Sequence, residues 1–193
     1  VAFDHRNLFD RLLENSTIPR EEHYATIIHI KEMIFTAAAQ VAATQDGLDS
    51  HFALLVDKKY GARVVLDAHN KNLLVALAVE RNEAPQFTLE YGQDWKSHAD
   101  ALNPNFIKVL IRWSSINALN IPTTALLQEV FQWTSKTGRG LLLEIIPEDN
   151  KTALLISAAR EILELGITPA FWKIPLPQSL DEAKRIVQAS QGK

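Results

Sequence analysis

A lysine in the middle of an apolar run is the residue of this sequence best suited to covalent chemistry. Lys173 lies within residues 170–175 (AFWKIP), a short apolar run bounded by turn residues, which predicts a buried strand. Burying an ammonium group is unfavourable unless an acid pairs with it or it gives up its proton. Two interpretations therefore stay open: a strand-end lysine whose amine reaches solvent or an acid, and an uncharged amine that attacks a carbonyl carbon.

Further charged side chains lie in or directly after other apolar runs: Asp4, Asp57, Glu80, Lys108 and Glu144. In a parallel barrel, the carboxyl ends of the strands and the loops after them build the active site. Each of these charges alone is explained as an ordinary strand-end residue. Two lysines and several carboxylates inside one barrel must pair or take part in a reaction. The pattern predicts an active site, and an internal salt-bridge network is the alternative.

These charges depend for their positions on a regular alternation of strands and helices. We expect strands at residues 1–6, 52–56, 73–79, 106–113, 141–146 and 170–175. We expect helices at residues 7–14, 19–44, 62–70, 122–137, 152–165 and 179–189, and another that contains Trp95, His98 and Leu102. Asp46-Gly47 should end the second helix, while Ser179 and Glu182 form a capping box at the start of the last one.

Six repeats of strand, loop and helix predict an α/β fold. Continuous apolar strands indicate a parallel sheet that is covered on both faces, as in an eight-unit barrel or a doubly wound open sheet. No glycine-rich phosphate motif opens any helix, which disfavours the open sheet of nucleotide-binding proteins. We therefore expect a (β/α)8 TIM barrel, with about six βα units in one domain at residues 1–193. Because residue 1 would begin inside a strand, we expect an excised or C-terminally incomplete domain.

The composition excludes several other classes of protein. Of the 193 residues, 47% are hydrophobic and 22% are charged, and the formal net charge is -3. Neither sign of charge dominates a long segment, so we expect no nucleic-acid or membrane partner. There is no cysteine, no signal-peptide pattern and no histidine pair with metal-ligand spacing. We expect a cytoplasmic protein that uses neither a metal ion nor a cofactor, and Ser114 and Ser115 lack a nucleophile-elbow sequence.

Six short sequences follow one another in an order typical of a known family. They are AFDHR at 2–6, LLVD at 54–57 with YG at 60–61, LEYG at 89–92, FIKVL at 106–110, LE at 143–144 and WKI at 172–174. Together they span nearly the whole chain and resemble the 5-dehydro-2-deoxyphosphogluconate aldolase domain of bacterial inositol catabolism, which is commonly fused behind a sugar kinase. The sequence is more distantly similar to the class I tagatose-bisphosphate aldolases, which are (β/α)8 barrels.

The resemblance implies a role for each matching residue. Lys173 would be the Schiff-base lysine and Glu144 would act in proton transfer, while Lys108 and Asp4 would line the same pocket. A second ammonium group beside Lys173 would disfavour the protonated form of its amine, and an iminium on that lysine would accept electrons during carbon–carbon cleavage. We also expect five residues to bind the substrate: His5, Arg6, Asp57, Glu80 and Arg112.

The chain also departs from the family pattern. Pro175-Leu176 replaces the usual acidic pattern after the lysine, Arg81 replaces a lysine, and WSS at 113–115 replaces YNP. The resemblance implies a metal-independent class I aldolase. Its substrate would be a phosphorylated keto sugar acid such as 5-dehydro-2-deoxygluconate 6-phosphate, cleaved to dihydroxyacetone phosphate and malonate semialdehyde. The alternatives are a non-catalytic barrel beside a sugar kinase and a different Schiff-base lyase. A homo-oligomer or a fused kinase domain would be its protein partner.

Overall fold

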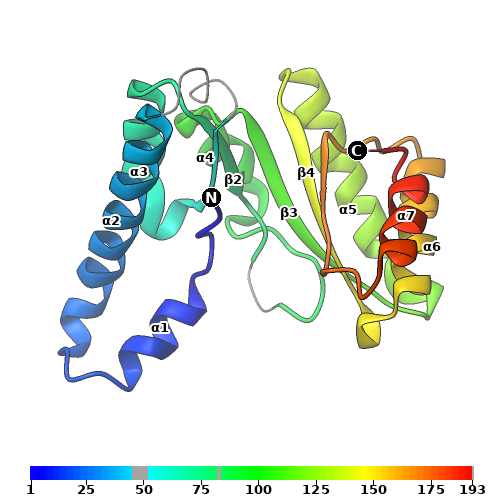
Figure 1. Cartoon of the computed structure of the whole chain (residues 1–193), viewed down its shortest axis with the longest axis horizontal. Helices are drawn as coiled ribbons and strands as arrows, with labels where there is room; N and C mark the ends of the chain where they lie inside the picture. Colours follow the sequence, from blue (N-terminus) through cyan, green and yellow to red (C-terminus); the bar gives the residue numbers. More distant parts are fainter. Residues whose placement is uncertain (45–51, 82–83, 193) are drawn as a thin grey trace. The chain divides into compact units, whose positions relative to one another are not determined.

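The computed structural model describes residues 1–44, 52–81 and 84–192, and the turn predicted at Asp46-Gly47 lies outside this part. The described chain has an α/β fold with five parallel strands and seven α-helices (Figure 1). It forms two compact units, which we call unit 1 (Val1–Asn82 with Glu90–Asn105) and unit 2 (Glu83–Leu89 with Phe106–Lys193). This agrees with a fold of repeated βα elements, and the closed eight-unit barrel stays a prediction.

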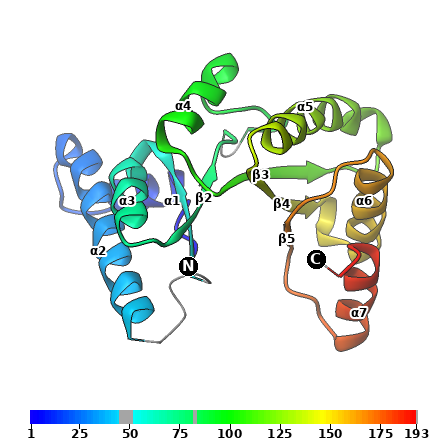
Figure 2. The same ribbon diagram turned by 90° about the horizontal axis from the view of Figure 1, so that it is seen from above.

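Unit 1 contains two parallel strands, β1 (Ala53–Asp57) and β2 (Leu74–Ala78). Its helices are α1 (Asn7–Glu14), α2 (His23–Ala43), α3 (Lys58–Asn70) and α4 (Trp95–Leu102). Short 3₁₀ turns, η1 (Arg20–Glu22) and η2 (Gly92–Asp94), precede α2 and α4. Helices α2 and α3 lie side by side (Figures 1 and 2).

The N-terminal segment is the largest departure from the predicted strands. Only Ala2 forms a parallel bridge, to Leu55 of β1, so residues 1–6 are not an extended strand. The Phe3 amide donates to the Leu55 carbonyl at 2.9 Å. After that point the carbonyls of Phe3 and His5 accept from Lys31 Nζ, at 2.9 and 3.0 Å. A lysine side chain thus takes the place of a neighbouring strand.

The first two helices each bury one face. In α1, Leu13 is buried with Ile27 and Tyr60, whereas Leu8 and Leu12 are exposed. The buried residues of α2 follow helical spacing and include one lysine: Ile27, Lys31, Phe35, Ala38 and Ala42. The buried face of α2 therefore includes a charged residue that the sequence analysis did not single out.

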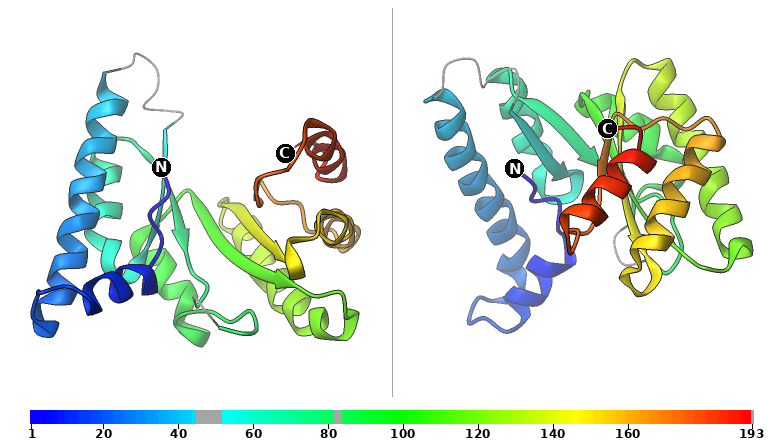
Figure 3. Two further views of the ribbon diagram at one scale, coloured as in Figure 1. Left: turned by 60° about the horizontal axis from the view of Figure 1, so that its bottom comes forward. Right: turned by 45° about the vertical axis from the view of Figure 1, so that its right-hand side comes forward.

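Unit 2 contains the strands β3 (Phe106–Trp113), β4 (Gly140–Pro147) and β5 (Phe171–Lys173), paired in parallel in that order. Its helices are α5 (Asn117–Lys136), α6 (Thr152–Glu164) and α7 (Leu180–Ala189), and a short 3₁₀ turn, η3 (Glu148–Asn150), follows β4. Helix α5 packs against β3 and β4 (Figure 2). The orange and red helices of Figure 3, α6 and α7, lie side by side.

The two faces of β4 differ in exposure. Leu141, Leu143 and Ile145 are fully buried, on the strand that packs against α5 and α6. The alternate residues Leu142, Glu144 and Ile146 are half-buried. One face of this strand is therefore less covered than the other, and a charged side chain lies on its more accessible face.

Strand β5 is shorter and more exposed than predicted. It has three residues, and Phe171 is 52% exposed although the apolar run predicted a buried strand. Among the described residues, β5 is the last strand of the sheet and pairs with β4 alone. An edge strand leaves side chains accessible, so Lys173 does not bear the full cost of burial.

The ends of the unit 2 helices largely follow the predicted signals. Gly138 and Gly166 adopt φ of 70° and 77° directly after α5 and α6, a backbone region in which glycine is unstrained. The Ser179 hydroxyl accepts from the Glu182 amide at 3.2 Å and caps α7, but Glu182 binds the Gln178 amide instead of completing the capping box. Helix α5 begins one turn before Pro122. No described helix has the length and apolar character needed to cross a membrane.

Candidate active site

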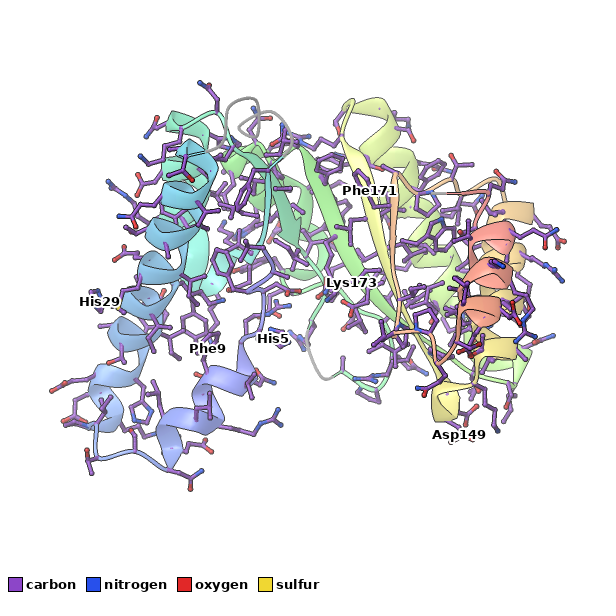
Figure 4. The ribbon with its side chains drawn as sticks, viewed as in Figure 1. His5, Phe9, His29, Asp149, Phe171 and Lys173 are labelled. Atoms are coloured by element: carbon purple, nitrogen blue, oxygen red, sulfur yellow. The ribbon has the colours of Figure 1, made fainter. Side chains whose placement is uncertain are left out.

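Three charged side chains of unit 2 meet at one carboxylate oxygen. Lys108 Nζ of β3 and Lys173 Nζ of β5 each lie 2.9 Å from Glu144 Oε2 of β4. We call Lys108, Glu144 and Lys173 the charged triad. The sequence predicted all three as site residues, and the structure brings them together (Figure 4 marks Lys173).

The register of the parallel strands produces this meeting. Glu144 is aligned with Lys173 on β5, and Lys108 is aligned with Leu142, two residues before Glu144. Since side chains alternate between the faces of a strand, residues two apart share a face. The three charges therefore project from the same, more accessible face of the sheet.

The members of the charged triad differ in their access to solvent. The side chains of Lys108, Glu144 and Lys173 are 2%, 14% and 37% exposed. Both ammonium groups contact the same carboxylate, and Lys173 is the more exposed of the two. An incoming ligand can reach Lys173, while Lys108 is too buried to be its first contact.

A pocket of about 570 Å³ lies at the carboxyl ends of β3 and β4. Arg112 and Ile146, which are aligned across the two strands, line it together with loop residues Phe87, Ser114 and Glu148. Ile146 follows Glu144 by two residues on the same face of β4. The pocket therefore lies just beyond the charged triad in the strand direction, where barrel enzymes place their active sites.

The rim of this pocket carries an acid that the sequence did not single out. Glu148 Oε2 accepts hydrogen bonds from the Ser115 amide at 3.0 Å, the Ser115 hydroxyl at 3.0 Å and the Ser114 hydroxyl at 3.2 Å. These bonds, the one from the Ser115 amide first, hold the pKa of Glu148 below its ordinary value. Ser114 and Ser115 thus act as hydrogen-bond donors to Glu148.

The predicted residues of unit 1 form a separate set of ion pairs. Arg6 Nη1 lies 3.2 Å from Glu90 Oε2, and Arg6 Nη2 lies 2.8 Å from the Glu80 carbonyl and 3.5 Å from Glu80 Oε1. Arg6 and Glu80 are both buried. This pair connects two segments of unit 1. Glu90, the other partner of Arg6, was not predicted because it does not follow an apolar run.

Lys31 is the residue of unit 1 that the sequence analysis missed. Its side chain is fully buried and pairs with the equally buried Asp57. Burial lowers the pKa of Lys31, and the negative charges of Asp57 and Asp4 oppose that shift. Asp57 also caps α3, since its Oδ1 accepts from the Tyr60 amide at 2.9 Å. The signal was available, because Lys31 lies four residues from both Ile27 and Phe35 on the buried face of α2.

The comparisons with known proteins identify a family. Residues 1–192 match the family described as "Uncharacterized protein conserved in bacteria (DUF2090)". The chain belongs to this family. No curated protein matched the sequence.

A solved structure resembles the chain in fold. It is the crystal structure of Cgl0159 from Corynebacterium glutamicum, a structural genomics target, with a TM-score of 0.58 and 15% sequence identity. The match covers 98% of this chain but only 64% of that protein. At this identity the likeness concerns the fold alone.

Proposed function

We propose that this member of the family is a class I, Schiff-base aldolase that acts on a phosphorylated keto sugar acid. The observation that supports it is the contact of Glu144 Oε2 with both Lys108 Nζ and Lys173 Nζ, at 2.9 Å each, beside a pocket. A partly exposed amine next to a carboxylate is the minimum that imine chemistry requires. The substrate would be 5-dehydro-2-deoxygluconate 6-phosphate, as the resemblance of six sequence motifs implies.

Imine formation begins with a proton transfer within the charged triad. Glu144 accepts a proton from the Lys173 ammonium group, and the neutral amine then attacks the ketone carbon of the substrate. The carbinolamine that forms loses its hydroxyl group as water, after taking a proton back from Glu144. The product of this step is an iminium on Lys173, and one water molecule is released.

Carbon–carbon cleavage follows from the electron demand of that iminium. Glu144 removes the proton of the hydroxyl group on the β carbon, and the bond between the α and β carbons breaks. Its electron pair moves into the iminium to give an enamine, while the β carbon leaves as malonate semialdehyde. Protonation of the enamine and addition of water release dihydroxyacetone phosphate and restore the amine of Lys173.

The remaining predicted residues receive more limited roles. Lys108 is the most buried member of the charged triad, so we assign it to holding Glu144 in place. Arg112 lines the pocket and is exposed, as an anion-binding residue must be. The roles predicted for Asp4, His5, Arg6, Asp57 and Glu80 stay predictions. A homo-oligomer and a fused kinase also stay predictions.

A cleavage assay tests this function. Lys173→Met should lower the rate at which 5-dehydro-2-deoxygluconate 6-phosphate is split by about 10³-fold or more, since a covalent nucleophile is lost. Lys184→Met is the matched control, because Lys184 is 68% exposed on α7 and pairs only loosely with Asp181, at 4.0 Å. A chelator should leave the rate of the unmodified protein unchanged. Absence of cleavage by the folded, unmodified protein would favour the rival function, a non-catalytic barrel.

A further inference from the structure

Three hydrogen-bond donors of the loop after β3 converge on one point at the rim of the pocket. The Ser115 amide, the Ser115 hydroxyl and the Ser114 hydroxyl all donate to Glu148 Oε2, at 3.0, 3.0 and 3.2 Å. We call these three groups the donor site. Three donors aimed at one oxygen are the arrangement that proteins use to bind a carboxylate or a phosphate.

The donor site is held in place independently of Glu148. The side-chain amide of the buried Asn120 clamps Ser114, as its Oδ1 accepts from the Ser114 amide at 3.0 Å and its Nδ2 donates to the Ser114 carbonyl at 2.9 Å. The Ser114 hydroxyl also accepts from the Ile116 amide, at 3.1 Å. The donors should therefore keep their positions if the carboxylate leaves.

The acceptor, by contrast, comes from a side chain on the surface. Glu148 lies in η3, directly after β4, and the whole residue is exposed. The donor site opens on the pocket that Arg112 lines. The neighbouring acid, Asp149, pairs with Lys151 at 2.8 Å, so its charge is compensated. Arg112 therefore places a positive charge at the pocket through which an anionic group of the ligand would reach the donor site.

We propose that the donor site and Arg112 form the subsite for an anionic group of the ligand, a carboxylate or a phosphate, and that Glu148 occupies this subsite when the ligand is absent. An incoming anion replaces the carboxylate of Glu148 on the same three donors, so the number of hydrogen bonds at the donor site is kept. Arg112 then donates a charge-assisted hydrogen bond to the anion, in addition to the three bonds from the donor site.

The subsite lies at a useful distance from the charged triad. A strand rises about 3.3 Å per residue, so Ile146 in the pocket lies about 6.6 Å beyond Glu144 along β4. An anionic group bound beyond Ile146 leaves the body of an extended sugar acid over Glu144. This assignment of the subsite to a substrate group rests on the proposed aldolase function, whereas the anion binding itself does not.

Anion binding to the full chain tests the subsite. Inorganic phosphate and malonate are titrated separately, by calorimetry and by following the Ser115 amide signal in NMR spectra. Glu148→Ala should tighten binding of the preferred anion about tenfold, because the competing carboxylate is gone. The tighter of the two probes identifies the group, phosphate or carboxylate, that the subsite takes.

Three further variants make the result specific. In the Glu148→Ala background, Arg112→Gln and Ser115→Ala should each weaken binding several-fold. Lys184→Met, on the exposed surface of α7, should leave binding unchanged. Because anion binding is measured without cleavage, failure of the subsite is distinguishable from failure of the aldolase function. If Glu148→Ala weakens anion binding or leaves it unchanged, or if the Ser115 amide signal does not respond to either anion, the subsite is wrong. Thermal unfolding confirms that each variant is folded.

Discussion

Both units of the molecule contain clusters of charged side chains, yet the two sets differ in their exposure to solvent and in how the charges pair. In unit 1, Lys31 and Asp57 are sealed from solvent, and the Arg6 side chain is held by Glu80 and Glu90. In unit 2, exposure rises from Lys108 through Glu144 to Lys173, and two cations share one carboxylate oxygen. The pair of Lys31 and Asp57 is thus closed to solvent, whereas Lys173 of the charged triad is accessible to it.

This difference separates two interpretations that the sequence left open for the same residue types. A buried ion pair such as that of Lys31 and Asp57 stabilises the fold. Lys31 adds to this effect because it also donates hydrogen bonds to two backbone carbonyls. An open triad can take part in chemistry, because its outermost amine can exchange its partner for a ligand. The internal salt-bridge network that was the alternative for the whole chain fits the buried pair of Lys31 and Asp57 best, and the charged triad stays the candidate for chemistry.

Neutralising the carboxylate of the charged triad should have the largest effect. Glu144→Gln keeps the size of the side chain but removes the proton acceptor, so cleavage of the sugar acid should slow by about 10²–10⁴-fold. Glu164→Gln, on the exposed side of α6, serves as the control and should leave the rate unchanged. A Glu144→Gln protein with full activity would show that the charged triad is as purely structural as the pairs of unit 1.

Breaking the closed pair of unit 1 should instead destabilise the protein. Lys31→Met leaves the fully buried Asp57 without its cation, so the free energy of unfolding should fall by about 3–5 kcal/mol. Lys59→Met, which breaks the exposed pair with Asp10, should cost at most about 1 kcal/mol. Denaturant unfolding of the two variants compares them directly, and equal losses would contradict the contrast between closed and open pairs.

Acid should release the Glu148 contact with a smaller, local effect. Hydrogen bonds lower the pKa of Glu148, so their contribution is complete above the ordinary value of 4.5 and is lost as the pH falls through the lowered pKa. The Ser115 amide signal should move with that titration. In Glu148→Gln the same signal should be independent of pH, and a pH-independent signal in the unmodified protein would refute the contact.

The fold was predictable where the sequence pattern is local. The strand at Phe106–Trp113 and the helix at Asn7–Glu14 have the predicted bounds, and the other elements differ mainly at their ends. The N-terminal strand was not predictable, because its pairing is replaced by Lys31, a distant residue. The exposure of Phe171 also depends on which strands are neighbours, and an apolar run looks the same at an edge and in the centre.

The candidate site was predictable in its members but not in its contacts. Charges at the ends of parallel strands indicated Lys108, Glu144 and Lys173 correctly as a group. The sequence could not show that Lys108 would be buried and Lys173 exposed, since that depends on register and on the edge of the sheet. Glu148 and Lys31 were missed because their partners, Ser115 and Asp57, are distant in the sequence and come close only in the folded structure.

Trapping of the imine tests the central proposal most directly. The full chain is incubated with dihydroxyacetone phosphate and reduced with borohydride, and its peptides are then weighed by mass spectrometry. The charged triad predicts one reduced adduct on Lys173, present in Lys31→Met if that variant folds and absent from Lys173→Met. No adduct on a folded, unmodified protein, or an adduct confined to other lysines, would contradict the assignment of Lys173 as the Schiff-base residue.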